Sequence, residues 1–311
     1  MTYEEIKHLF QYDENESKIF LPNEIFDDLT GNVTKNSLHL TFSYSYIYLT
    51  TWMYRYAKHI SVTNGFIDNG KVKEILGYNA TTKGLDYMTK KNGLLDQLGY
   101  TKTVKDFPTH WTYDEFEGIE FGMYSSYKDY LSYLNLSRKF NIKLPVKAIH
   151  RYNNEVLDGT YYEFENTHSI PFEVFMFCIA NDKLGTTGFY LYSYIKRMND
   201  MFPDGWDVAF DKLAKVTGVP ASTLERYMDE LRRYNMIIVK YNQEVFSLAM
   251  RLEDRKACTY IINEFNQFID TPQKIKKMKV ITTKEYFKNT AKENIHIWGK
   301  KAEITEELLP Y

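Results

Sequence analysis

The segment 208–248 constrains the fold more than any other part of the chain, because a sharp break separates two patterns of helical periodicity in it. At this break Gly218 permits a left-handed helix cap, and Pro220 cannot continue the preceding helix. Ser222 and Glu225 have the spacing of a capping box, in which side-chain oxygens accept hydrogen bonds from free N–H groups at a helix start. The sequence therefore predicts two helices joined by a tight turn.

A β-hairpin is expected directly after the second helix. Residues 236–239 are apolar and β-branched, residues 240–243 are polar, and residues 245–248 are again mostly apolar, which predicts two strands around a loop. Helix, turn, helix and hairpin follow each other in this order in a winged helix-turn-helix. The segment is therefore predicted to be such a module.

A winged helix points its second helix at the DNA major groove, where polar and basic side chains contact bases and phosphates. Arg226 and Arg233 are the best candidates for contacts with guanine edges or phosphates. The candidate DNA-binding residues of this module are Ser222, Thr223, Arg226, Tyr227 and Arg233 in the helix, with Lys240 and Asn242 in the wing. The same fold also serves as a protein-protein module, so this alternative stays open.

Residues 71–105 repeat the pattern in a weaker form. A short helix at 71–76, a break at Gly77, a second helix at 81–92 and a wing hairpin near 94–104 are expected. The candidate DNA-binding residues of this first module are Thr81, Thr82, Lys83, Tyr87, Lys90 and Lys91 in the helix, with Lys102 and Lys105 in the wing. Two DNA-reading modules in one chain are therefore predicted.

Local charge favours DNA contact more than the net charge of −2 does. Residues 71–105 carry seven lysines and three acids, a sum of +4, and residues 208–242 carry six basic and four acidic residues, a sum of +2. Residues 271–301 carry nine lysines and two acids, whereas residues 1–30 carry eight acids and two lysines. The lysine run 274–279 either contacts phosphates beside the second module or is a solvated tail.

The chain is expected to be α+β, mainly helical with small β wings, and to hold two winged helices in tandem. Long aromatic helices at 42–60 and 187–202 introduce the two modules, and a further helix is expected at 258–269. The expected division is 1–36 as an acidic leader, 37–123 as the first winged-helix domain, 124–169 as a connecting helix with short strands, 170–255 as the second winged-helix domain and 256–311 as a helical, lysine-rich tail. The 27 Tyr and 20 Phe reflect either base stacking or, more readily, a coding sequence rich in A and T.

Motifs for catalysis or metal binding are weak. The stretch from Gly65 to Lys71 fits the pattern G-x-x-x-x-G-K, but Val72 follows where a phosphate-binding loop needs Ser or Thr for magnesium. The seven histidines are scattered, with no pair at the i,i+2 or i,i+4 spacing that chelates a metal. Cys178 and Cys258 are the only cysteines and lie far apart. We therefore expect neither an enzyme nor a bound metal or cofactor.

Two such modules in one chain, each introduced by a long aromatic helix, resemble the plasmid replication initiators that bind repeated origin sequences. They are also similar to the replication-initiation and replisome-organising proteins of phages and plasmids of low-GC Gram-positive bacteria. The resemblance covers about residues 40–105 and 170–250 and rests on architecture, without a diagnostic motif. It implies origin binding without enzymatic activity, through the two recognition helices at 81–91 and 222–233.

The expected partner is therefore double-stranded DNA, and the resemblance adds replication proteins and a second copy of the chain as further candidates. A transcriptional regulator of a mobile element is an alternative DNA-binding function, and a protein-binding scaffold is an alternative of another class. The N-terminus lacks an apolar signal core, and no run of eighteen apolar residues exists, so a cytoplasmic location without a membrane segment is expected.

Overall fold

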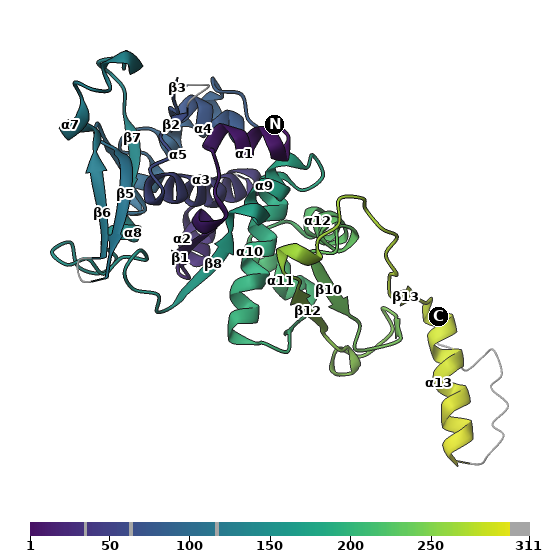
Figure 1. The fold of residues 1–311 in the computed structure, drawn as a ribbon. Coiled ribbons are helices and arrows are strands. Elements are labelled where there is room, and N and C mark those ends of the chain that lie inside the picture. The colour runs from purple at the N-terminus through teal and green to yellow at the C-terminus, as the bar shows by residue number, and fades with distance from the viewer. Residues whose placement is uncertain (34–35, 62–64, 116–117, 299–311) are drawn as a thin grey trace.

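A computed structural model describes residues 1–33, 36–61, 65–115 and 118–298, with side chains described as far as residue 291. The acidic C-terminal end expected around Glu303 to Glu307 lies outside the described residues. The chain combines α-helices with several small two- and three-stranded sheets (Figure 1). Helices hold 45% and strands 18% of the residues, which confirms the α+β class.

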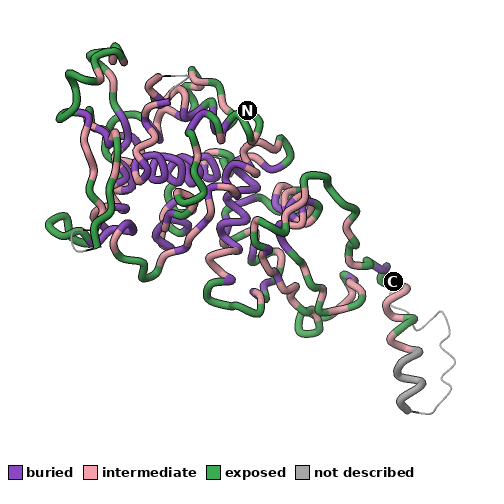
Figure 2. Tube along the Cα trace, viewed as in Figure 1, coloured by how far each residue is buried: buried purple, intermediate pink, exposed green. Residues whose placement is uncertain are grey.

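Two long helices, α3 (Ser37–Arg55) and α10 (Gly185–Met201), pack against each other at the centre of the fold. Both were expected near these positions, although α3 ends before residue 60. Burial of α3 is not confined to one face. Every residue of α3 from Leu40 to Tyr54 is buried, as the continuous purple tube in Figure 2 shows.

Hydroxyl groups make this complete burial possible, because buried polar groups need hydrogen-bond partners. The hydroxyls of Ser45 and Thr50 in α3 donate to backbone carbonyls one turn earlier. Tyrosine hydroxyls reach across to other elements, and Tyr48 donates to Ile170 O at 2.9 Å, Tyr190 to Thr217 O at 3.0 Å. Many of the tyrosines are therefore core residues whose hydroxyls tie elements together.

The two central helices belong to an internal duplication that the sequence analysis missed. In the first copy β1 (Lys18–Pro22), α2 (Ile25–Asn32) and α3 follow each other, and in the second copy β8 (Thr167–Pro171), α9 (Phe172–Ala180) and α10 do. The signal in the sequence is P-x-E-[I/V]-F, which begins at Pro22 and again at Pro171, an offset of 171 − 22 = 149.

The pairing of β1 with β8 has the symmetry that such a duplication implies. The strands are antiparallel, and Phe20 lies opposite Ser169. Since 169 − 20 = 149, each of these residues faces its own equivalent in the other copy. A local two-fold axis therefore passes between them and relates the two halves of the central core.

Residues 1–33, which were expected to form an acidic leader, are part of this core. Helix α1 (Tyr3–Phe10) begins with a capping box between Thr2 and Glu5. Ile6, Phe10 and Phe26 are each at most 3% exposed, and they belong to one cluster of buried side chains that continues to Tyr260. Glu4, Glu5, Asp13 and Glu14 are exposed, whereas Glu16 pairs with Lys58 at 2.6 Å and Glu24 with Arg151 at 2.6 Å, so these two acidic side chains that approach the core have basic partners.

The region 206–262 contains the two helices predicted from the break at Gly218. It consists of β9 (Trp206–Val208), α11 (Phe210–Thr217), α12 (Ala221–Arg233), β10 (Ile237–Lys240), β11 (Val245–Phe246) and β12 (Cys258–Ile262). Three of these strands form an antiparallel sheet in the order β10-β12-β9.

The hairpin predicted within this region is wrong in its second strand. Strand β12, rather than residues 245–248, pairs with β10, and β11 instead pairs in parallel with β13 (Lys279–Val280). The helix predicted over 258–269 is also wrong, because β12 and a 3₁₀ turn at Phe265–Gln267 occupy it. Hydrogen bonding to strands on both sides outweighs the helical periodicity of this stretch.

The first region shows the larger departures from expectation. Its elements are β2 (Ile60–Ser61), β3 (Gly65–Phe66), α4 (Asn69–Ile75), a 3₁₀ turn (Lys83–Leu85), α5 (Asp86–Thr89), α6 (Leu94–Gln97), β4 (Thr101–Val104), β5 (Pro108–Asp114), β6 (Gly118–Met123), α7 (Tyr124–Tyr127), a 3₁₀ turn (Ser132–Leu134), β7 (Ile142–Pro145) and α8 (Val146–Ile149). The connecting helix expected after residue 124 is reduced to α7 and turns. The hairpin expected at 94–104 is wrong, since β4 pairs with β7.

The recognition helix predicted over 81–92 is also wrong, because it is replaced by a 3₁₀ turn and the single turn of α5. Asn92 has a φ of 60°. A Cβ on Gly93 would lie 2.7 Å from Met88 O, so the chain turns back tightly there. The buried Lys143 ammonium lies 2.6 Å from the Asp96 carboxylate and also donates to Lys90 O. This ion pair fixes the turn in place of a continuing helix.

The C-terminal helix α13 (Thr283–Trp298) projects from the body beyond β13 (Figure 1). Across the part of the chain that the structure describes, none of the helices has the length and apolar character needed to cross a membrane.

Candidate nucleic-acid interface

The turn between α11 and α12 is fixed by packing on both sides. Gly218 caps α11 with a φ of 65°, and Val219 is buried directly after it. Helix α12 then begins at Ala221 after Pro220, without a side-chain cap, so the predicted capping box at Ser222 and Glu225 is wrong. Pro at this boundary sets the backbone and leaves no N–H there to satisfy. Ser222 therefore lies inside the first turn of α12.

Helix α12 has a polar face opposite its buried side. Leu224, Met228 and Leu231 face inward, as predicted from their spacing. Ser222, Arg226 and Arg233 are exposed on the opposite side, whereas Thr223 and Tyr227 are half-buried at its edge. These five predicted residues therefore share one helix and border one surface.

The two candidate arginines of this face are held only loosely. The Arg226 guanidinium lies 4.8 Å from the centre of the Tyr227 ring, and the Arg233 guanidinium lies 3.8 Å from the Glu230 carboxylate. Ion pairs this exposed contribute little free energy, so both guanidiniums remain available to a ligand.

Arg232, which the sequence analysis did not single out, connects α12 to its surroundings. Its Nη1 donates to the Tyr241 hydroxyl at 2.9 Å, and its Nη2 donates to Lys276 O at 2.5 Å. The same guanidinium lies 3.5 Å from the Asp229 carboxylate. Arg232 therefore ties α12 to neighbouring segments, whereas the adjacent Arg233 faces solvent. The two differ in role because successive helical residues point in directions about 100° apart.

The wing loop was expected at 240–243, and the structure instead has a longer connection, the loop 241–257, between β10 and β12. Lys240 is exposed at the end of β10. Asn242 was expected to contact DNA, but its amide Nδ2 donates to Ala257 O at 2.7 Å and to the Thr259 hydroxyl at 2.9 Å. Asn242 therefore closes the base of the loop.

The residues predicted for the first module are spread over turns instead of one helix. Asn79 Oδ1 accepts hydrogen bonds from both the backbone N–H and the hydroxyl of Thr81. The Tyr87 hydroxyl bonds to His39 Nδ1 at 3.1 Å, and Lys90 lies 3.0 Å from Asp86. Thr81, Lys83, Lys90, Lys91, Lys102 and Lys105 are exposed, while Thr82 and Tyr87 are half-buried.

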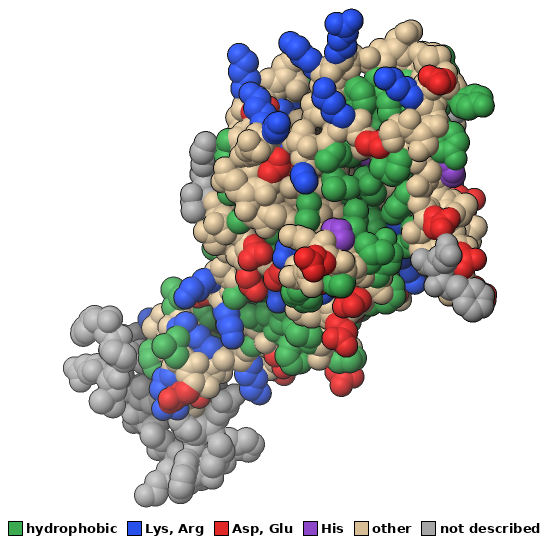
Figure 3. All heavy atoms as spheres, turned by 90° about the vertical axis from the view of Figure 1, so that its left-hand side faces the viewer, with side chains coloured by type: hydrophobic (Ala, Val, Ile, Leu, Met, Phe, Trp, Pro, Cys, Tyr) green, Lys and Arg blue, Asp and Glu red, His purple; other side chains and the backbone are tan. Residues whose placement is uncertain are grey.

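Basic side chains nevertheless gather at one end of this half of the molecule, at the top of the face in Figure 3. Lys105 Nζ donates to Arg138 O, which brings the end of β4 beside an exposed arginine. Lys128 and Lys139 are also exposed nearby in sequence. The first region therefore offers positive charge without an exposed helix to carry it.

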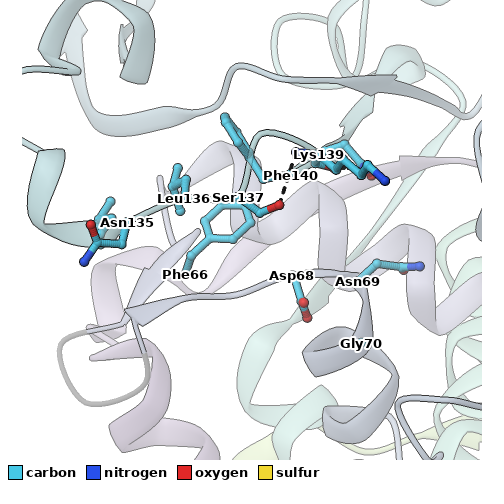
Figure 4. Close-up of a pocket in the computed structure, with 11 residues that line it drawn as sticks. Phe66, Asp68, Asn69, Gly70, Asn135, Leu136, Ser137, Lys139 and Phe140 are labelled. Carbon is cyan, nitrogen blue, oxygen red and sulfur yellow. Dashed lines mark hydrogen bonds between the residues drawn. The ribbon is translucent and has the colours of Figure 1, made fainter.

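Beside this region lies a pocket of about 420 Å³, drawn in Figure 4. Phe66, Asp68, Asn69 and Gly70 form one wall, and residues 134–137 and 139–141 form the other. The stretch that fits G-x-x-x-x-G-K borders it, but Asp68 Oδ1 accepts the backbone N–H of Lys71 at 2.8 Å. A carboxylate thus occupies the helix start that a phosphate-binding loop would offer to phosphate.

Comparison with protein-family models, with curated proteins and with solved structures finds no match. The site must therefore be judged on its own chemistry.

Several residues that could carry catalysis are held inert by burial. Burial lowers the pKa of His59 and of His168 to about 3, so both rings are neutral at pH 7. His168 lies between the Tyr44 hydroxyl at 2.8 Å and Asn23 Oδ1 at 3.0 Å, which is a structural arrangement. Burial also raises the pKa of the Cys178 thiol, which disfavours the reactive thiolate. Each of these three groups therefore has a structural role in the core at neutral pH.

Proposed function

We propose that the protein binds double-stranded DNA and that residues 185–262 form a winged helix-turn-helix. The order α10, β9, α11, α12, β10, loop, β12 is that of helix, strand, helix, recognition helix, strand, wing and strand in such a module. The sheet order β10-β12-β9 places the strand after the wing in the middle, which agrees with this assignment.

The exposed face of α12 is the observation that carries the proposal. Ser222, Arg226 and Arg233 supply a hydroxyl and two guanidiniums along a helix whose opposite side is anchored in the core. Such a helix can enter a major groove, and arginine is the side chain most often used to read guanine there. The loop 241–257 lies next to it, where a wing contacts the neighbouring backbone or minor groove.

We further propose that the first region is a divergent counterpart of this module. Helix α3 is the duplicate of α10, and α4, α5 and the antiparallel pair β4 and β7 follow it in the order of two helices and two strands. The long connection between β4 and β7 carries the additional hairpin of β5 and β6. The exposed lysines at 83, 90, 91, 102 and 105 suit contacts with phosphates more than base reading.

A chain with two DNA contacts agrees with the replication initiators that the sequence resembles, and origin binding is the role that we propose for it. Footprinting on the replicon that encodes the chain tests this role. Protection of repeated sites at an origin, with two half-sites about 34 Å apart, is expected. Protection of a promoter operator alone would assign the chain to transcriptional regulation. Absence of any footprint, with affinity insensitive to salt, would favour a protein-binding scaffold and refute the proposal.

A further inference from the structure

The lysine-rich run after the second module is docked on the protein. We define residues 270–281 as the C-terminal strap. Its path begins where the backbone N–H of Gln273 donates to Arg233 O at 2.9 Å, at the end of α12. It finishes at β13, which pairs in parallel with β11, and Ile281 N then donates to Phe246 O at 2.9 Å. The strap therefore bridges α12 and the loop 241–257.

Contacts along α12 hold the middle of the strap. Lys277 Nζ lies 2.6 Å from the Asp229 carboxylate and 3.5 Å from the Glu225 carboxylate. The backbone carbonyl of Lys276 accepts a hydrogen bond from Arg232, and these contacts leave the Lys274 and Lys276 side chains exposed. Figure 1 shows the strap passing from α12 towards β13 and α13.

The charges of α12 explain why this contact matters. Its solvent side carries Glu225, Asp229 and Glu230 beside Arg226 and Arg233. Carboxylates at this position repel the phosphates of an approaching duplex. The hydrogen bond to Asp229 raises the pKa of Lys277, which keeps the ammonium charged. Lys277 thus offsets part of the negative charge of two carboxylates that would otherwise oppose DNA.

We infer that the C-terminal strap is a phosphate-binding element of the DNA interface. In this arrangement the DNA phosphates between two grooves are contacted by Lys274, Lys276 and Lys279. One of these grooves is the major groove that α12 enters, and the other lies beside the loop 241–257. Lys277 is a positioning residue, because it acts through Glu225 and Asp229. This inference rests on the proposed DNA-binding function and extends it to a segment outside the winged helix.

The first test compares two variants of the full chain that lose the same charge. Lys274→Gln with Lys276→Gln removes two strap lysines, and Lys284→Gln with Lys288→Gln removes two exposed lysines of α13. Binding of a fluorescent 30-base-pair duplex of mixed sequence is measured by anisotropy from 50 to 300 mM salt, since backbone contacts do not need the specific target. Loss of two phosphate contacts should reduce the steepness of log affinity against log salt by about 1.8. If both proteins bind equally at 1 M salt, this difference corresponds to up to ~60-fold weaker binding by the variant at 0.1 M salt.

The outcomes separate this inference from the proposed function. A smaller slope in the strap variant, with little change in the α13 variant, supports the inference. Equal behaviour of the two variants while the wild type binds would overturn the inference and leave DNA binding intact. Tighter binding by the strap variant would also overturn it, because the strap would then cover the interface. A wild type that binds no duplex at any salt overturns both.

A rescue experiment tests Lys277 itself. Lys277→Gln exposes two carboxylates and should weaken binding, whereas the triple variant Lys277→Gln, Glu225→Gln, Asp229→Asn should recover most of the lost affinity. Recovery is the readout that distinguishes charge neutralisation from a purely structural contact, since the triple variant also lacks the ion pairs. Failure of the triple variant to recover, with an unchanged melting temperature, would refute the positioning role.

Discussion

Replacing Arg226 and Arg233 together by Ala tests the proposed recognition helix most directly. Both side chains are exposed on α12, and neither is held by more than a ring contact or one exposed ion pair. The substitution should therefore change the free energy of unfolding by less than about 1 kcal/mol, because arginine and alanine both favour helices. Each lost contact with a base edge costs about 1–3 kcal/mol of binding free energy. The double variant should lose about 2–6 kcal/mol, at least ~30-fold in affinity.

The assay is a competition gel shift at fixed salt, with the footprinted site as probe and a scrambled duplex as competitor. Loss of base contacts should reduce the preference for the specific site, whereas loss of phosphate contacts alone would reduce both affinities alike. The control, Lys284→Ala with Lys288→Ala, removes the same charge from α13. The reasoning is refuted if the arginine variant melts like the wild type and still binds the specific site with unchanged affinity and preference.

Three further predictions concern the scaffold. Burial lowers the pKa of His59 and His168 to about 3, so between pH 6.5 and 3 the unfolded chain binds more protons than the folded chain. The free energy of unfolding should therefore be highest above pH 6.5 and should fall below it by up to ~1.4 kcal/mol per pH unit for each histidine. Urea titrations at several pH values would measure this fall. Gly218→Ala should lower the melting temperature, since φ is 65° and a Cβ would lie 3.1 Å from Leu40 and Thr30 atoms, whereas the control Gly31→Ala, with open space around it in a helix, should not. Asp96→Asn should destabilise the chain by about 3–5 kcal/mol in chemical denaturation, because it strands the buried Lys143 ammonium, while Glu253→Gln in an exposed pair should cost under about 1 kcal/mol.

The sequence predicted best those elements whose boundaries depend on local chemistry. Gly218 and Pro220 mark the turn between α11 and α12, and the apolar spacing of Leu224, Met228 and Leu231 correctly orients α12. Once the buried side of α12 is known, helical periodicity places Arg226 and Arg233 on the opposite side, so their exposure could be predicted as well. Neighbouring residues decide each of these features, so no knowledge of the tertiary fold was needed.

Features that depend on distant partners could not be predicted in the same way. Strand β10 pairs with β12 rather than with the nearer β11, and β4 pairs with β7 across an inserted hairpin. The turn that replaces the helix at 81–92 depends on Lys143, which lies far along the chain from Asp96. Capping at Ser222 failed for a local reason, because Pro220 already sets the start of α12. The duplication at Pro22 and Pro171 is visible in the sequence only as a five-residue signal, which lies far upstream of the two predicted recognition helices.

The duplication constrains how the two proposed DNA contacts could act. Strands β1 and β8 pair across a local two-fold axis, and α3 packs against α10, so the introducing helices of both halves lie in one buried cluster. Two modules joined by a flexible linker could adapt to different spacings between half-sites, whereas two modules that share a core cannot. Under the proposed function the spacing of the half-sites would be part of what the protein recognises, because bending DNA to fit a rigid protein costs free energy. The aromatic core that holds the halves together would then contribute to specificity without contacting a base.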